Sequence, residues 1–207
     1  MLIKLYEENP NPKQIKSIIE CLKDGGIIIY PTDTIYGMGC DIFKQKTVER
    51  IAQIKGVKSK KSNFSIICHD LSHISDYTKP FETSIYKILK KLTPGPFTFI
   101  LNANNNIPKL FQNNKKTIGI RVPSNEIVLE IVRELGNPIL TTSIIDEDDI
   151  LEYTTDPELI YEKYCDLVDI VIDGGYGGNV PSTVVDCTDA ENIQLIRQGK
   201  GDFSEFL

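Results

Sequence analysis

Polar side chains that could bind a ligand gather in four places along the chain, each at the end of an apolar run. Open α/β sheets bind their ligands at the ends of strands, so we interpret the four clusters together as one candidate site. The clusters are Pro31–Gly37 directly after Ile27–Tyr30, Arg121 with Val122 and Pro123, the hydroxyl run Thr141–Ser143, and Pro181–Asp186 after the glycine-rich Gly174–Gly178.

These clusters supply hydroxyls and arginines but no pair of a nucleophile and a base. Arg121 can hold a carboxylate or a phosphate through paired hydrogen bonds, although a salt bridge to one of the acids in the C-terminal part is an alternative. Thr32, Asp33 and Thr34 favour ligand binding over a purely structural turn. Gly174–Gly178 lacks the lysine and spacing of a phosphate-binding loop. The residues therefore indicate a site that positions a phosphorylated or carboxylated ligand and neutralises its charge.

Cysteines and histidines give no sign of a metal site or a disulfide framework. The five cysteines are scattered and never form Cys-x-x-Cys. His69 and His73 are four residues apart, which would suit a metal on a helix, but no third ligand is arranged nearby. We expect the two histidines to be solvated residues at a helix start. The sequence predicts neither a bound metal nor a prosthetic group.

Charge is distributed unevenly along the chain. Residues 1–121 hold 19 Lys and Arg against 10 Asp and Glu, whereas residues 122–207 hold 4 against 19. The basic residues are densest over Lys44–Lys61. Such a segment suggests a surface that faces an anion, although a solvated helix and loop is the alternative.

The composition is typical of a globular protein, with 207 residues, 41% hydrophobic and 25% charged. No linker, repeat or low-complexity block divides the chain, so we expect one domain over residues 1–207. No apolar run approaches the length of a bilayer span, and the first residues do not form a secretory signal. We expect a cytoplasmic protein that does not bind membranes.

Helical and strand patterns alternate along the chain. Asn11 and Pro12 mark the start of one helix, and Asp156 and Pro157 mark another, because each pair combines a cap with a first-turn proline. Further helices are expected at 45–55, 82–91 and 125–135. Strands are expected at 27–30, 64–68, 97–101, 118–121, 139–142, 168–172, 183–186 and 193–197. This order predicts a mixed α/β fold with one large twisted sheet flanked by helices.

Six segments, in this order and spacing, resemble the YrdC-type threonylcarbamoyl-AMP synthase family, and over its full length the chain is most similar to the YciO branch. They are Gly26–Gly37, Thr93–Thr98, Thr117–Pro123, Pro181–Asp186, Arg197–Gly199 and Gly201–Phe203. The resemblance implies a YrdC/RibB-type fold with a concave, positively charged face. It also implies that L-threonine, bicarbonate and ATP react to L-threonylcarbamoyl-AMP and pyrophosphate.

The resemblance further implies partners and residue roles. A threonylcarbamoyl-transferase complex would pass the group to adenosine 37 of tRNA, and binding of double-stranded RNA is expected. Magnesium would accompany ATP. Lys55 and Arg121 are expected to be catalytic. The threonine pocket is expected to comprise Thr34, Arg121, Thr141 and Ser182, and the ATP contacts Lys55, Thr117, Ser143 and Arg197.

Three stretches depart from the family pattern, all on the expected nucleotide side. Val57 stands where the basic loop usually has arginine, and Ile145 where the Ser-x-Asn motif has its amide. Ser62-Asn63-Phe64 replaces the usual Lys-Pro-Leu, with Cys68 where many members have histidine. An acidic run, 146–149, follows Ile145; it suggests a solvated loop rather than a magnesium site. The alternative hypothesis is therefore a paralogue with reduced synthase activity that binds RNA or a nucleotide.

Overall fold

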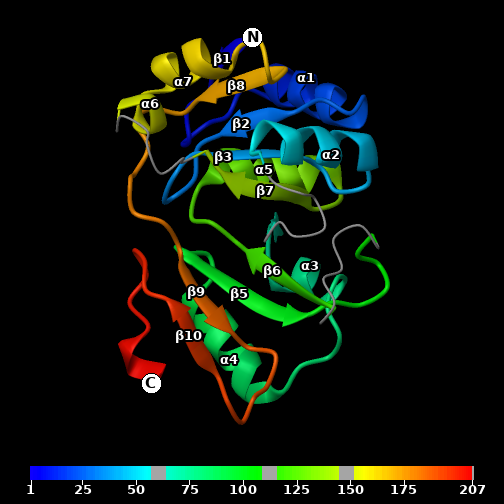
Figure 1. The fold of residues 1–207 in the computed structure, drawn as a ribbon, viewed down its shortest axis with the longest axis vertical. Helices are drawn as coiled ribbons and strands as arrows, with labels where there is room; N and C mark the ends of the chain where they lie inside the picture. The colour runs from blue at the N-terminus through cyan, green and yellow to red at the C-terminus, as the bar shows by residue number, and fades with distance from the viewer. Residues whose placement is uncertain (57–63, 109–115, 145–151, 207) are drawn as a thin grey trace.

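The computed structural model describes residues 1–56, 64–108, 116–144 and 152–206, which form one mixed α/β fold. Its strands join a single ten-stranded sheet in the order β1-β8-β2-β3-β7-β4-β6-β5-β9-β10. Figure 1 shows β1, β8, β2, β3 and β7 in the upper half and β6, β5, β9 and β10 in the lower half. The strands are β1 (Leu2–Lys4), β2 (Ile28–Tyr30), β3 (Gly37–Asp41), β4 (Ser65–Ile67), β5 (Phe97–Asn102), β6 (Thr117–Arg121), β7 (Ile139–Ser143), β8 (Ile170–Asp173), β9 (Thr183–Asp186) and β10 (Gln194–Arg197). The predicted fold class is confirmed.

The helices begin where local capping chemistry predicts. The Asn11 side chain accepts a hydrogen bond from Lys13 N at 3.0 Å, and Asp156 accepts one from Glu158 N at 2.9 Å. Both caps precede a first-turn proline, which confirms the two predicted starts. The helices are α1 (Pro12–Lys23), α2 (Gln45–Ile54), α3 (Leu71–Ser75), α4 (Thr83–Leu92), α5 (Glu126–Leu135), α6 (Glu152–Thr155) and α7 (Pro157–Tyr164), followed by a 3-10 turn at Ser204–Phe206.

Helices cover the two faces of the sheet differently in its two halves (Figure 1). Apolar residues of α1 and α5 pack with β1, β2 and β8 on one face, and those of α2 and α7 pack with β3 and β8 on the other. In the lower half, α3 and α4 pack with the apolar residues of β5 and β6. Side chains alternate between faces along a strand, so the residues between these apolar positions point to the opposite face.

The other face of the sheet carries a row of small and polar residues where β7, β4 and β6 adjoin. Leu140 pairs with Ile66 across β7 and β4, and both are buried under helices. Their neighbours Thr141 and Ser65 therefore share the other face, and Gly119 of β6 pairs with Ser65 in the same row. This row of hydroxyls and glycine provides the surface on which the candidate site is built.

Tyr30 crosses two glycines of β3 to reach this face. Its hydroxyl donates to Thr141 Oγ1 at 2.7 Å, although β3 lies between β2 and β7 in the sheet. A Cβ at Gly37 would lie 2.9 Å from the Tyr30 ring, and a Cβ at Gly39 would lie 3.1 Å from the Tyr30 hydroxyl. The glycines of β3 therefore leave the space that the buried ring occupies.

The structure contains elements that the sequence pattern does not predict, namely β1, β3 and α6. Gly37 and Gly39 resemble turn residues in sequence, and only pairing with β2 and β7 makes this segment a strand. The expectation of two solvated histidines is wrong for His73, which is only 5% exposed. Its ring stacks on that of His69, with ring centroids 4.3 Å apart, and contacts Tyr77 edge-on.

Substitution of Gly39 by alanine should strongly destabilise the fold. The new Cβ would lie 2.1 Å from Leu140 O, a backbone atom that cannot rotate away. We expect the free energy of unfolding, measured by urea denaturation, to fall by at least about 2 kcal/mol. Gly136→Ala is the control, because Gly136 has a positive φ and open space around it, so only backbone strain of about 1 kcal/mol is expected. Equal losses would contradict a steric role for Gly39.

Buried His73 should make stability depend on pH. Burial, together with the charge of His69, lowers the pKa of His73 from 6.5 to about 4, against the opposing charges of Asp76 and Asp70. Between these values the unfolded chain binds more protons, so stability should fall as the pH drops from 6.5 toward 4. Urea unfolding across this range should show a shallower dependence in His73→Gln than in the wild type. Identical slopes would contradict the assignment.

Candidate functional site

Arg121 is the centre of the candidate site. It ends β6, is 9% exposed, and donates from Nη2 to Asp33 Oδ1 at 2.8 Å and to Thr34 Oγ1 at 3.0 Å. Asp33 and Thr34 follow β2, which is separated from β6 by β3, β7 and β4 in the sheet. The sequence left open a salt bridge from Arg121 to an acid in the C-terminal part. Arg121 does form a salt bridge, but its partner is Asp33, so the expected partner is wrong.

One donor of Arg121 remains unused. Its Nε is buried and has no hydrogen-bond partner among the described residues. Burial lowers the pKa of the guanidinium, while the Asp33 carboxylate opposes this shift and Arg197 adds to it. Arginine keeps its charge in proteins, so Nε is a buried, charge-assisted donor that lacks an acceptor. An anionic ligand could supply that acceptor.

Ser182 and Arg197 form the neighbouring part of the site. Arg197 Nη2 donates to Ser182 O at 2.8 Å, and the Ser182 hydroxyl lies 2.8 Å from that of Thr98. The oxygens that accept from Arg197 in the described structure are thus uncharged. The charge of Arg197 also lowers the pKa of Arg121, as the smallest of the causes that act on that guanidinium. Within the described structure, Arg121 forms an ion pair with the carboxylate of Asp33.

The remaining predicted residues on this face are separated from Arg121 along the strands. Thr141 and Gly119 lie in the middle row, paired through Ser65. Ser143 and Thr117 each lie two residues farther along antiparallel strands, in the same direction. Arg121 lies at the other end of β6, about 13 Å from Thr117 at the usual rise per residue. Of the expected ATP contacts, Thr117 and Ser143 therefore lie at the end of the face away from Arg121, whereas Arg197 lies beside Ser182. The expected threonine contact Thr141 lies between the two ends.

Lys55 comes from another element. It is the C-cap residue of α2, whose buried residues pack on the face opposite Thr141. The segment after Gly56, including Val57, lies outside the described residues, as do Ile145 and the acidic run after it. Among the other predicted residues, the structure links Thr34 to Arg121 and Ser182 to Arg197. The pairing of β5 with β6 places Thr98, which contacts Ser182, next to the end of β6 that carries Arg121.

Several residues of the site were not assigned a role from sequence. Asp33 belongs to the Thr-Asp-Thr cluster at the end of a predicted strand, so its carboxylate could have been assigned to the site from sequence. Thr98 lies within an apolar strand, and its contact with Ser182 depends on the parallel pairing of β5 with β9. Lys200 Nζ donates to Asp33 O at 2.6 Å. Such a contact between residues 167 positions apart leaves no local pattern.

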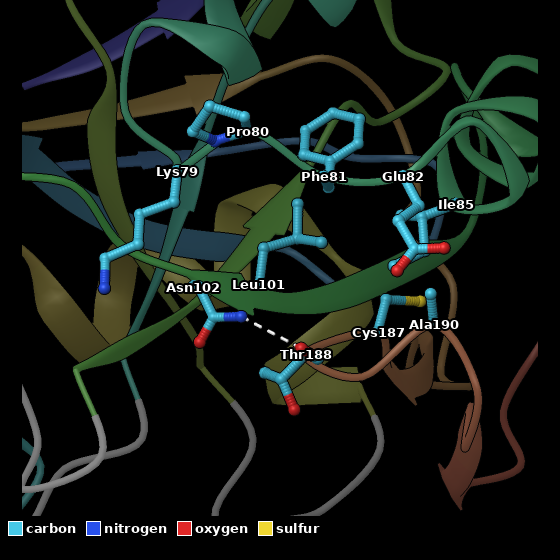
Figure 2. Close-up of a pocket in the computed structure, with 10 residues that line it drawn as sticks. All are labelled: Lys79, Pro80, Phe81, Glu82, Ile85, Leu101, Asn102, Cys187, Thr188 and Ala190. Carbon is cyan, nitrogen blue, oxygen red and sulfur yellow. Dashed lines mark hydrogen bonds between the residues drawn. The ribbon is translucent and has the colours of Figure 1, made fainter.

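A separate cavity of about 350 Å³ lies at the other end of β5 and β9 (Figure 2). Phe81, Ile85, Leu101 and Cys187 form its apolar lining, and Asn102 donates to Thr188 O at 2.9 Å at its edge. None of the predicted site residues lines this cavity. We therefore base the functional assignment on the polar face around Arg121.

Metal binding and membrane insertion find no support among the described residues. No three His, Cys, Asp or Glu side chains in 1–56, 64–108, 116–144 and 152–206 are grouped to hold a metal ion. Within the same ranges, every helix is too short or too polar to cross a bilayer.

Comparison with known proteins gives relatives along the whole chain. Residues 20–199 match the Sua5/YciO/YrdC family model, described as "Telomere recombination". The protein YciO of Escherichia coli (strain K12) is 38% identical over 205 residues, 98% of this chain and 97% of the relative. The crystal structure of E. coli YciO superimposes with a TM-score of 0.91 at 37% identity, covering 100% of this chain and 99% of that chain.

More distant relatives have a named activity or ligand. A threonylcarbamoyl-AMP synthase of Coxiella burnetii (strain RSA 493 / Nine Mile phase I) is 26% identical over 184 residues, 88% of this chain and 97% of the relative. The fold also matches P. abyssi Sua5 complexed with L-threonine, with a TM-score of 0.88, 24% identity, and coverage of 100% of this chain and 59% of that chain. Since the matches extend over most of the sequence, this protein belongs to the Sua5/YciO/YrdC family.

Proposed function

We propose that this protein forms L-threonylcarbamoyl-AMP and pyrophosphate from L-threonine, bicarbonate and ATP, as a step in the modification of adenosine 37 in tRNA. The observation that carries the proposal is the buried Arg121 guanidinium, which lies next to Thr34 and whose Nε has no acceptor within the described part of the chain. Two of the distant relatives are consistent with it, one named threonylcarbamoyl-AMP synthase and one complexed with L-threonine.

The threonine half of the reaction uses the end of the face around Arg121. The guanidinium accommodates the amino acid's carboxylate, and the hydroxyls of Thr34 and Ser182 are assigned as further hydrogen-bonding groups. Thr141 completes the set, with its hydroxyl oriented by the hydrogen bond from Tyr30. This end therefore provides both the charge and the directional contacts that an amino acid requires.

The chemistry requires alignment rather than a protein nucleophile. The threonine α-ammonium group first loses a proton, and bicarbonate takes up a proton and releases water to give carbon dioxide. The neutral amine then attacks carbon dioxide, which forms the C–N bond of a carbamate and releases a further proton to solvent. A carbamate oxygen then attacks the α-phosphorus of ATP, which forms a P–O bond while the bond to pyrophosphate breaks. Positive groups that face the reacting anions stabilise the charge that develops in this step.

The nucleotide half uses the remaining predicted residues. Arg197 lies beside Ser182, and Thr117 and Ser143 occupy the far end of the face, so a nucleotide would extend from Arg197 along β6 and β7. Lys55 is assigned to the triphosphate from the family pattern. Magnesium is assigned to ATP as its counter-ion, because the described residues form no metal-binding cluster.

The departures at Val57 and Ile145 favour a slow enzyme. Loss of one guanidinium or amide donor from a reacting anion costs roughly 3 kcal/mol of transition-state stabilisation. The RNA-binding alternative relies on the basic residues around α2. There Arg50 is paired with Asp169 at 3.4 Å and donates to Leu167 O, so one cation of this segment is engaged within the protein. We therefore favour a site for an amino acid and a nucleotide over an RNA-binding surface as the functional feature of this protein.

Incubation with ATP, L-threonine and bicarbonate should yield the adenylate, detected by mass spectrometry. Arg121→Lys keeps a positive charge but loses the paired donors, so we expect the KM for threonine to rise by about tenfold or more, with ATP binding largely unchanged. Arg133→Lys is the matched control, because Arg133 is an exposed arginine on α5 paired with Glu126 and Glu130.

A known synthase run in parallel controls for the assay itself. No adenylate above an enzyme-free blank, with that synthase active, would refute the catalytic proposal. In that case, a salt-dependent shift of duplex RNA would favour the RNA-binding alternative, since phosphate contacts weaken steeply with salt.

A further inference from the structure

Asp33 is a buried carboxylate to which the proposed reaction assigns no role. Its side chain is only 9% exposed, and it lies in the centre of the Thr-Asp-Thr cluster. Oδ1 accepts from Arg121 Nη2 at 2.8 Å, and Oδ2 accepts from Ser124 N at 3.0 Å. The carboxylate therefore belongs to the candidate site and not to the protein surface.

The Asp33–Arg121 pair has unused hydrogen-bonding capacity of both kinds. Each carboxylate oxygen can accept two hydrogen bonds, and the structure shows one at each oxygen. Arg121 Nε is a donor with no acceptor in the described part of the chain. The ammonium of Lys200 donates to the main-chain oxygen of Asp33 and does not occupy either carboxylate oxygen in the described structure. The positively charged donor Arg121 and the negatively charged acceptor Asp33 are thus in contact, and both have unused hydrogen-bonding capacity.

We propose that Asp33 binds the α-ammonium group of an amino acid whose carboxylate is bound by Arg121, so that the site selects zwitterions over simple carboxylates. This inference rests on the proposed function, in that it assigns the residue that recognises the amino group of the same substrate. An α-amino acid carries both charges on one carbon atom, which matches two groups that are themselves in contact.

Electrostatic interactions at the Asp33–Arg121 pair favour a zwitterion over a simple carboxylate. An ion pair that is already neutral as a whole can receive a neutral zwitterion without a change in net charge. A carboxylate without the amine would bring a second negative charge close to Asp33 without the ammonium group that offsets it in an amino acid, and repulsion between like charges in a buried site is strong. A site built to bind an N–H group also rejects an analogue that lacks it, because its polar partner is left unpaired.

The test compares L-threonine with (R)-3-hydroxybutanoate, the same carbon skeleton without the amine, by isothermal titration calorimetry of the full chain. We expect the wild type to bind L-threonine at least about tenfold more tightly than the analogue. Asp33→Asn keeps the size of the side chain and removes its charge. It should weaken binding of threonine by about tenfold or more, with binding of the analogue unchanged or stronger.

Asp41→Asn is the matched control. Asp41 is also buried and accepts hydrogen bonds from Phe43 N and Asn137 Nδ2, away from Arg121, so its substitution should leave both affinities unchanged. Circular dichroism establishes that each variant is folded. If Asp33→Asn does not fold, the comparison of the two ligands on the wild type decides the question alone.

The outcomes separate the two proposals. Equal affinity of the wild type for both ligands, or an unchanged threonine affinity in folded Asp33→Asn, would overturn the role of Asp33 and leave the adenylate assay untouched. Absence of threonine binding to the wild type would overturn both. Discrimination by Asp33 without adenylate formation would support the zwitterion site and refute the synthase activity.

Discussion

A buried guanidinium must have partners within the protein, and this requirement organises the centre of the molecule. Removing one partner from a buried ion pair typically costs about 3–5 kcal/mol, because the remaining charge is left uncompensated. Arg121 meets the requirement with Asp33 and Thr34, which are 88 and 87 positions away in sequence. The loop after β2 is thereby held against the end of β6. The contact that stabilises this arrangement is the one that defines the candidate site.

The rest of the sheet supports this contact by separating its two faces. Apolar residues of β4, β5 and β6 are buried under α3 and α4, which leaves hydroxyls and Gly119 on the opposite face. Gly119 is in the middle row, where a Cβ would lie 2.4 Å from Ser65 Oγ. Tyr30 crosses β3 to orient Thr141 on the same face. The site therefore consists of fixed polar groups on strands, which suits a reaction based on alignment and charge stabilisation.

The sequence predicted the helix starts and most of the strands, because these depend on contacts between nearby residues. Asn11 and Asp156 cap helices through contacts within a few residues, and most strands appear as apolar runs. The strand β3 and the burial of His73 depend on pairing and packing with distant segments, so their local patterns are misleading. The clustering of hydroxyls and arginines at strand ends identified residues that are in contact in the fold, such as Thr34 with Arg121. The Asp33–Arg121 pair and the Thr98–Ser182 contact required the strand order, which the sequence pattern does not determine.

The proposed function requires that Arg121 Nε, which has no acceptor among the described residues, donates a hydrogen bond to the carboxylate of the substrate. A crystal structure of the protein with saturating L-threonine tests this most directly. The account predicts a threonine carboxylate oxygen about 3 Å from Arg121 and the amino group on the side of Asp33. Threonine bound in the cavity between Phe81 and Cys187, or a site in which Arg121 contacts only Asp33 and Thr34, would contradict it.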